Sequence, residues 1–149
     1  MGYLLDTNHC SQIIMQHADL LTQLAQHAEA EIATCTIVQG ELIDMVGRSQ
    51  QKEANLRLVR SFLDNIQVHP VTPAIADLYG NLKANIFNHF APKDKDQRRR
   101  FKLKDLGFGD NDLWIAATAL ERNLILISRD SDFTRLQEVI SFPLESWIP

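Results

Sequence analysis

The chain has 149 residues, the usual length of one domain, and a chain of this size buries roughly 68–70% of its unfolded surface on folding. Hydrophobic residues make up 45% and charged residues 23%, which excludes a disordered chain, a collagen-like repeat and a disulfide-dense miniprotein. Nineteen acidic and fifteen basic residues give a net charge of −4, so any site for a polyanion must be a local basic patch. We predict one domain over residues 1–149.

The cysteines and the N-terminal residues indicate in which cellular compartment the protein is expected. Cys10 and Cys35 form no CxxC pair and no metal-ligand spacing with histidine, so we expect buried thiols in a reducing compartment, with one disulfide as the alternative. The N-terminus has no basic region, and no run of about 20 apolar residues occurs anywhere. We therefore expect a cytoplasmic protein without a signal peptide or a membrane segment.

In residues 1–90, short apolar runs alternate with segments whose apolar residues recur at helical spacing. Asn8 and Ser11 are candidate N-caps for the first helix, and Pro73 suits the first position of a later one. The predicted elements are, in chain order, a strand over residues 3–6, a helix that follows it, a helix over 19–28, a strand over 31–35, a helix from Thr36, a helix over 54–65, a strand over 67–71 and a helix over 73–90.

The C-terminal part continues this alternation. Asn123 is expected to end a helix, before an all-apolar run of the kind that is buried on both faces of a sheet. The predicted elements are, in chain order, a helix over residues 113–122, a strand over 124–128, a short helix over 132–138 and a last strand or extended tail over 139–144. Strands that alternate with helices of this length predict an α/β sandwich around a mostly parallel sheet.

A basic segment separates these two parts. Residues 93–104 hold seven basic and two acidic residues, a net charge of +5, which leaves −9 for the remainder of a chain whose total is −4. We expect an extended loop or a frayed helix end there. A run of this kind is more often a solvated loop than a binding site, so the charge alone does not assign a function.

Several acids occupy positions from which their side chains can converge. Asp6 ends the first strand, Asp112 lies at the start of the helix before the apolar strand, and Asp130 follows that strand by two residues. Ligands of open parallel sheets bind beyond the carboxyl ends of the strands, where such residues meet. Glu41 lies in an otherwise apolar helix, where a carboxylate is costly to bury unless a positive group meets it.

Converging carboxylates need a cation, because each pair at about 4 Å repels by roughly 4 kcal/mol at an effective dielectric constant near 20. An all-oxygen site without histidine or cysteine suits Mg²⁺ or Mn²⁺, and not zinc. Such ions can activate water and neutralise the charge of an attacked phosphate, which favours phosphodiester hydrolysis.

Each acid also has a simpler explanation when it is considered by itself. Asp6, Asp110 and Asp112 lie where helix caps occur, and Asp130 and Asp132 suit a turn. The helical glutamate could extend to solvent. The five histidines show no metal-ligand spacing, so we expect them to be surface or core residues.

Four short motifs occur in a fixed order: LLDTN at residues 4–8, GEL at 40–42, NDLWIAA at 111–117 and ISRDSDF at 127–133. In order and spacing they resemble the PIN domain, and within it the VapC-type toxins of bacterial toxin–antitoxin pairs. The resemblance covers essentially the whole chain and implies a three-layer α/β/α sandwich and a Mg²⁺- or Mn²⁺-dependent endoribonuclease.

The resemblance also implies roles for single residues. Thr7 and Asn8 would orient Asp6, and Asp132 is the alternative to the fourth acid. The catalytic and metal-binding acids would be Asp6, Glu41, Asp112 and Asp130. Members of the family typically form homodimers, act on RNA (transfer RNA is the family expectation), and are silenced by an antitoxin whose tail occupies the groove, often with an arginine near the acids.

The chain departs from compact members of the family in the long basic connection before Asp112. Because the rest of the chain is strongly acidic, we hypothesise that this connection binds RNA phosphates. The residues concerned are Lys93, Lys95, Arg98, Arg99, Arg100, Lys102 and Lys104.

Three other functions remain open at this point. A haloacid dehalogenase-type phosphatase also has an aspartate after its first strand, but it uses a second aspartate two positions later, where this chain has Asn8. A non-catalytic PIN-like RNA-binding module is the second alternative. The third is an unrelated α/β domain in which the acids are helix caps.

Overall fold

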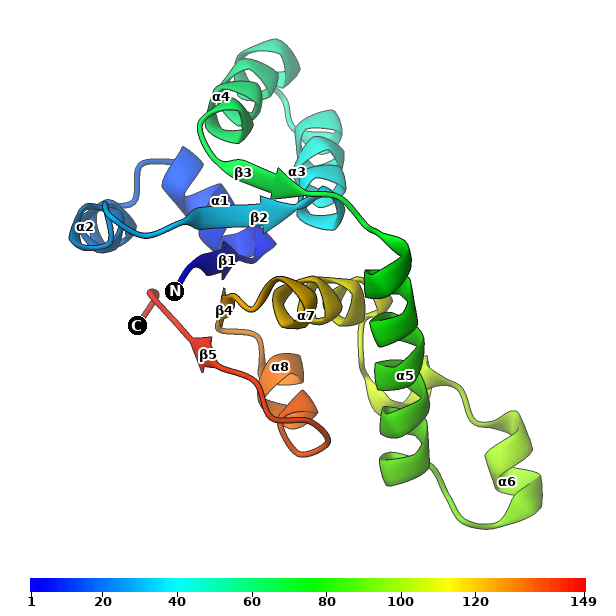
Figure 1. Ribbon diagram of the computed structural model, residues 1–149. Coiled ribbons are helices and arrows are strands. Elements are labelled where there is room, and N and C mark those ends of the chain that lie inside the picture. The colour runs from blue at the N-terminus through cyan, green and yellow to red at the C-terminus, as the bar shows by residue number, and fades with distance from the viewer.

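The protein, described here by a computed structural model of residues 1–149, is built on one five-stranded sheet in the order β3-β2-β1-β4-β5 (Figure 1). All four neighbouring pairs are parallel, which agrees with the predicted sheet. The strands are β1 (Tyr3–Leu5), β2 (Ile32–Cys35), β3 (Gln67–His69), β4 (Ile125–Ile127) and β5 (Leu144–Glu145).

Helices flank the sheet and complete the predicted α/β/α sandwich. Figure 1 shows α1 to α4 around the half of the sheet that holds β1 to β3, and α7 and α8 beside β4 and β5. The helices are α1 (Thr7–Ile14), α2 (Ala18–Gln26), α3 (Thr36–Arg48), α4 (Lys52–Asp64), α5 (Pro73–Phe90), α6 (Lys95–Arg100), α7 (Asp110–Arg122) and α8 (Ser131–Leu136). No helix has both the length and the apolar character needed to cross a membrane.

The central strands form the middle of a single hydrophobic core. Leu4 and Leu5 of β1 and Leu126 and Ile127 of β4 are fully buried, because helices cover both faces of a parallel sheet. This explains why β4 lies in an uninterrupted apolar run. Both cysteines are buried free thiols, as expected from their spacing.

The N-cap of α1 is Asp6, the simpler role that its position suggested, and the structure contradicts Asn8 and Ser11 as caps. The Asp6 carboxylate accepts a hydrogen bond from the backbone N–H of His9 at 2.9 Å. The helix therefore begins one residue after the acid that ends β1, and the cap fixes the direction of that acid.

The ends of α7 follow local backbone rules. Gly109 is the N-cap, so neither Asp110 nor Asp112 caps this helix, and both lie in its first turn. Asn123 ends the helix in the left-handed conformation at a φ of 55°, as its position in the sequence predicted. The last strand or extended tail was expected over residues 139–144, but the strand β5 begins only at Leu144 and ends at Glu145.

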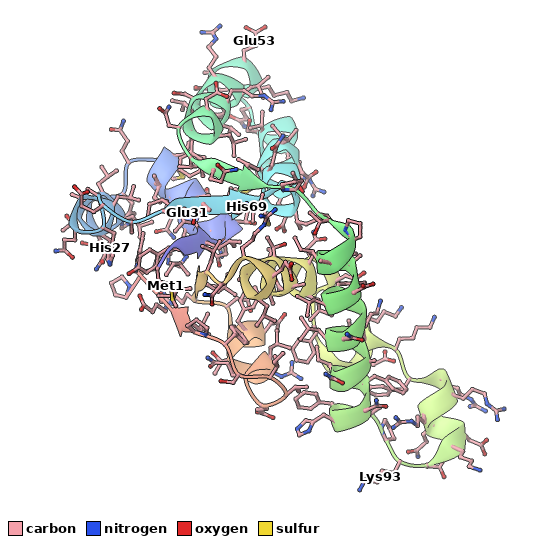
Figure 2. The ribbon with its side chains drawn as sticks, in the orientation of Figure 1. Met1, His27, Glu31, Glu53, His69 and Lys93 are labelled. Carbon is pink, nitrogen blue, oxygen red and sulfur yellow. The ribbon has the colours of Figure 1, made fainter.

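The basic segment is ordered as helix rather than extended loop. Residues 95–100 form α6 and Leu103–Leu106 form a short 3₁₀ helix, η1. Asp94 caps α6 by accepting from two backbone N–H groups. Arg98 donates to Asn88 Oδ1 of α5 at 2.6 Å, and Arg135 of α8 donates to the Leu106 carbonyl at 2.7 Å. These contacts hold an excursion that projects from the far end of α5, where Lys93 is labelled in Figure 2.

The strand order places two chain segments side by side at one edge of the sheet. From β1 the chain adds β2 and β3 on one side of the sheet, and then β4 and β5 on the other side. The strand order therefore reverses between β1 and β4, and parallel sheets bind ligands at such a switch point. In the register of this pair, Leu5 lies opposite Ile127. Asp6 and Ser128, the next residue of each strand, are therefore neighbours although they are distant in the sequence.

Candidate active site

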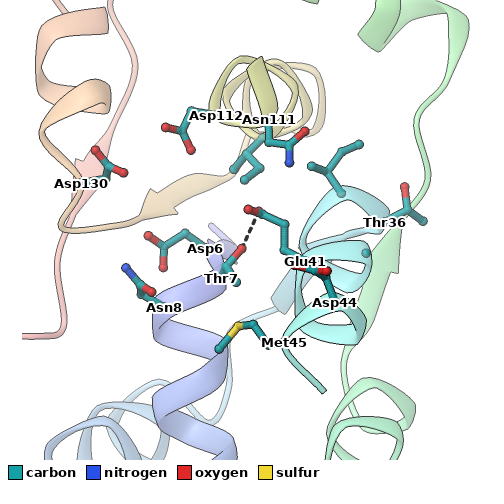
Figure 3. Close-up of a pocket in the computed structure, with 13 residues that line it drawn as sticks. Asp6, Thr7, Asn8, Thr36, Glu41, Asp44, Met45, Asn111, Asp112 and Asp130 are labelled. Carbon is teal, nitrogen blue, oxygen red and sulfur yellow. Dashed lines mark hydrogen bonds between the residues drawn. The ribbon is translucent and has the colours of Figure 1, made fainter. Parts of the chain in front are cut away.

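The four predicted acids line one cavity of about 660 Å³ at the carboxyl edge of the sheet. Asp6 lies at the end of β1 and Glu41 lies on α3. Asp112 lies in the first turn of α7, and Asp130 lies between β4 and α8. Figure 3 shows their side chains directed toward the same space. No basic side chain lines the cavity, so no lysine or arginine in its lining neutralises the four acids.

Asp130 and Asp132 occupy different positions relative to this cavity. One carboxylate oxygen from each of Asp112, Asp130 and Asp132 lies within 4.8 Å of the other two. Asp130 lines the cavity and also caps α8, whereas Asp132 accepts from the backbone N–H of Gly109 at 3.3 Å and is not part of the lining. Asp130 therefore faces the cavity, whereas Asp132 belongs to the same acid cluster from outside the lining.

The crowded acids affect the protonation of Asp112. Burial raises the pKa of its carboxyl to about 8, and hydrogen bonding with Asp132 and the charges of Asp130, Asp132 and Glu41 act in the same direction. Without a cation, the cluster retains a proton near neutral pH. A divalent ion would supply the positive charge and displace that proton.

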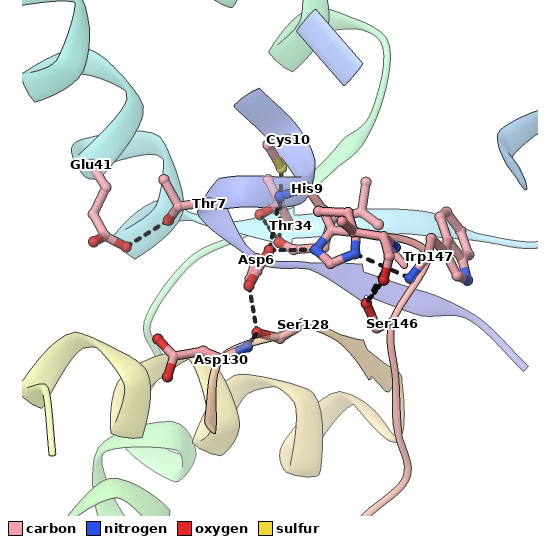
Figure 4. A network of polar contacts seen from close by, with 12 residues as sticks. Asp6, Thr7, His9, Cys10, Thr34, Glu41, Ser128, Asp130, Ser146 and Trp147 are labelled. Carbon is pink, nitrogen blue, oxygen red and sulfur yellow. Dashed lines mark hydrogen bonds and ion pairs between the residues drawn. The ribbon is translucent and has the colours of Figure 1, made fainter. Parts of the chain in front are cut away.

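Asp6 is held by three hydrogen-bond donors (Figure 4). Its Oδ1 accepts from the backbone N–H of His9 at 2.9 Å and lies 2.8 Å from His9 Nδ1, and its Oδ2 accepts from Ser128 Oγ at 2.5 Å. The residue is only 5% exposed. A carboxylate offers about four lone-pair positions, so these contacts fix its orientation and leave room for an ion.

The second ring nitrogen of His9 settles its tautomer. His9 Nε2 accepts from the backbone N–H of Trp147 at 3.2 Å, so this nitrogen carries no hydrogen. Nδ1 therefore carries the hydrogen and donates a hydrogen bond to Asp6 Oδ1. Through these two hydrogen bonds the fully buried imidazole links Trp147, in the C-terminal segment, to Asp6 at the end of β1.

The sequence did not identify His9 or Ser128 as site residues. His9 was one of five histidines expected to be surface or core residues, although its place three residues after Asp6 was an available signal. No local pattern could reveal Ser128, because its contact depends on the register of β1 with β4.

Thr7 and Asn8 were expected to orient Asp6, and the structure gives them other positions. Thr7 Oγ1 donates to Glu41 Oε1 at 2.7 Å, which turns the glutamate toward the cavity rather than outward to solvent. Asn8 lines the cavity. Asp110 lies outside it and accepts from the hydroxyl of Tyr79 at 2.6 Å.

The donor set fits a hard divalent cation. Carboxylates, amides and hydroxyls supply the polar groups of the lining, and neither histidine nor cysteine takes part. Both ring nitrogens of His9 are already engaged, so this histidine is not available as a ligand. Oxygen ligands of this kind suit Mg²⁺ or Mn²⁺ better than zinc.

The raised pKa of Asp112 predicts the pH dependence of stability in the metal-free protein. The folded state binds one more proton than the unfolded state between about pH 4, the ordinary aspartate value, and about pH 8. The free energy of unfolding should therefore fall as the pH rises through this window, and the fall should be smaller in Asp112→Asn. Urea unfolding in EDTA at several pH values measures it. Equal slopes in the two proteins would refute the interpretation.

The contact between His9 and Asp6 predicts an effect on metal affinity. His9→Leu removes the side-chain donor, and loss of a group that orients a metal ligand weakens binding by roughly 10- to 100-fold. His9→Asn keeps a donor near the position of Nδ1 and should retain more of the affinity. Titration calorimetry with Mn²⁺ measures both variants, with circular dichroism as the folding control. Wild-type affinity in His9→Leu would contradict the assignment.

Comparison with known proteins agrees with this architecture. The PIN domain profile matches residues 3–139. Ribonuclease VapC2 of Rickettsia felis is 30% identical over 152 residues, covering 99% of this chain and 98% of the relative. Ribonuclease VapC2 of Haemophilus influenzae is 27% identical over 149 residues, covering 99% of each chain.

Solved structures give the same result. The crystal structure of VapBC2 from Rickettsia felis, bound to a DNA fragment from their promoter, contains a chain that superposes with a TM-score of 0.77 at 28% identity, covering 99% of both chains. The family profile and the similarity to relatives both extend over nearly the whole sequence. The chain belongs to the PIN domain family.

Proposed function

We propose that this chain is a Mg²⁺- or Mn²⁺-dependent endoribonuclease, the toxin of a VapBC-type toxin–antitoxin pair, and that Asp6, Glu41, Asp112 and Asp130 form its active site. One observation carries the proposal: acids from four separate parts of the chain line one cavity that contains no basic side chain. The names of the relatives, Ribonuclease VapC2, support RNA as the substrate. The family membership excludes the phosphatase and the unrelated α/β domain.

The chain's own residues prepare the site for hydrolysis of a phosphodiester. A bound divalent ion would activate water and neutralise charge on the attacked phosphate. Asp6 is fixed before any ligand arrives by His9 and Ser128, and Thr7 holds Glu41 in the cavity. Because these contacts exist in the free protein, little reorganisation is needed when the substrate binds.

A groove next to the acid cavity suggests where an antitoxin would bind. An apolar groove of about 230 Å³ lies between α1, α3 and α4, and Met45 lines both this groove and the acid cavity. An antitoxin segment with apolar side chains fits the groove, and a cationic side chain beyond it would reach the acids. The similarity to a chain of the VapBC2 structure from Rickettsia felis supports an antitoxin partner. The proposal also includes a homodimer, as the resemblance to the PIN domain family implied.

The basic segment contributes the RNA contacts in this proposal. Arg98 has a structural role, since its guanidinium bonds Asn88 and lies 4.5 Å from the centre of the Phe87 ring. Of the predicted set, the side chains that remain exposed to contact phosphates are Lys93, Lys95, Arg99, Arg100, Lys102 and Lys104.

Loss of one site carboxylate should abolish cleavage without unfolding the protein. Asp6→Asn and Asp112→Asn should each reduce cleavage of an RNA substrate in Mn²⁺ by at least about 100-fold, the scale for loss of one electrostatic group from a catalytic site. EDTA should do the same to the wild type. Gel assays of labelled RNA measure cleavage, and far-ultraviolet circular dichroism monitors folding.

The matched control for these variants is Asp44→Asn. Asp44 lines the same cavity but is exposed and pairs with Arg48 at 3.1 Å, so its loss should change the rate only slightly. Wild-type cleavage by Asp6→Asn would refute the metal site. RNA binding without cleavage by the wild type would instead identify a non-catalytic RNA-binding module.

Charge reversal of Arg99 and Arg100 should weaken RNA binding and flatten its salt dependence. Each lost phosphate contact lowers the slope of log K against log salt by roughly 0.7 for a single strand, so we expect a decrease of about 1.4. Fluorescence anisotropy at several salt concentrations measures it. Reversal of Arg57 and Arg60, exposed on α4, makes the same change of net charge elsewhere and is the control. An unchanged slope would exclude these arginines from the RNA contact.

A further inference from the structure

A second cavity, of about 730 Å³, lies between α5, the 3₁₀ helix η1 and the start of α7. Its size is within the range of roughly 300–1,000 Å³ that is usual for small-molecule sites. Lysines and phenylalanines dominate its lining, which makes it chemically unlike the acid cavity. They are Lys83, Lys102, Lys104, Phe87, Phe101 and Phe108.

Two of the three lysines are available to an anion. Lys83 is committed, because its ammonium lies 3.4 Å from Asp110 Oδ1 and donates to the Tyr79 hydroxyl at 3.2 Å. Lys102 and Lys104 are exposed, and neither takes part in any ion pair of the structure. Asp110 is the only acid in the lining.

The three phenylalanine rings also differ in whether a cation already covers them. The guanidinium of Arg98 lies over Phe87 at 4.5 Å, and that of Arg135 lies over Phe108 at 4.3 Å. Phe101 has no cation over its ring, is only partly buried, and packs at a tilt of 55° against Phe87. Phe101 is therefore the ring on which a planar ligand can stack.

The two cavities are separated by the first turn of α7. Asp110 lines the basic cavity, whereas Asn111 and Asp112 line the acid cavity. These three consecutive residues belong to the first turn of α7, so both cavities border the same turn of this helix. A polymer strand that crosses this turn would contact both cavities.

We propose that the basic cavity binds one unstacked nucleotide of a single-stranded RNA, next to the phosphodiester at the acid site. The base stacks on Phe101, and the adjacent phosphates lie against Lys102 and Lys104. Aromatic faces combined with cationic groups are the usual means of holding single-stranded nucleic acid. Bases within a duplex are stacked and cannot enter, so this site selects unpaired RNA. The inference rests on the proposed nuclease function.

The test separates stacking from phosphate binding in a protein that does not cleave. In the Asp6→Asn background with Mg²⁺, Phe101→Leu should weaken binding of a single-stranded RNA oligonucleotide by roughly 5- to 100-fold, the effect of losing one stacked base. The salt slope and the binding of duplex RNA should not change. Lys102→Gln with Lys104→Gln should lower affinity and reduce the slope by about 1.4.

The matched control is Phe62→Leu, since Phe62 is also partly buried but lies on α4, away from the basic cavity. A photoreactive 4-thiouridine in the oligonucleotide should crosslink to residues 101–104. Unchanged single-strand binding by Phe101→Leu would overturn the inference. Conversion of a dimer to a monomer by the same variant would also overturn it, because a second copy of the chain would then occupy the cavity.

These outcomes are distinguishable from failure of the proposed function. If the wild type binds and cleaves RNA while Phe101→Leu does both equally well, only the nucleotide site is wrong. If the wild type neither binds nor cleaves RNA, the nuclease proposal itself fails.

Discussion

The parallel pairing of β1 with β4 is the contact on which the rest of the structure depends. It places Leu5 opposite Ile127, so that Asp6 and Ser128 leave the sheet together and form a hydrogen bond across the switch point. A shift of this register by one residue would turn every side chain of the strand to the opposite face. The fully buried leucines and isoleucines of both strands prevent such a shift, and core packing thereby fixes the position of a polar group.

Electrostatic repulsion limits how closely the acids can approach each other. Three donors fix the orientation of the Asp6 carboxylate, whereas burial and acidic neighbours raise the pKa of Asp112. The two carboxyl groups line the same cavity but have different environments. The cavity thus holds one acid of fixed orientation and one that binds a proton or a metal ion according to conditions.

Opposite charges are divided between two neighbouring regions of the molecule. The acids surround the switch point, and the basic segment projects from the far end of α5, where Arg98 ties α6 to Asn88 and Arg135 binds the Leu106 carbonyl of η1. This division suits a polyanionic substrate, because a metal ion offsets the acids only within the cavity while the basic residues attract the strand outside it. The first turn of α7 borders both cavities, with Asp110 in the lining of one and Asp112 in the lining of the other.

The alternation of strands and helices, the parallel sheet, the end of α7 at Asn123 and the four acids of the cavity could all be predicted from the amino-acid sequence. These features depend on local periodicity, on residues with special backbone preferences and on short motifs. The hydrogen bond of Ser128 with Asp6 and the contact of Arg135 with residues 93–106 join segments far apart in the chain, so they form only after strand register and helix packing are set. The cap of α1 and the contact of His9 with Asp6 are local, but the sequence offered several candidate caps and five histidines, and the folded chain selected among them.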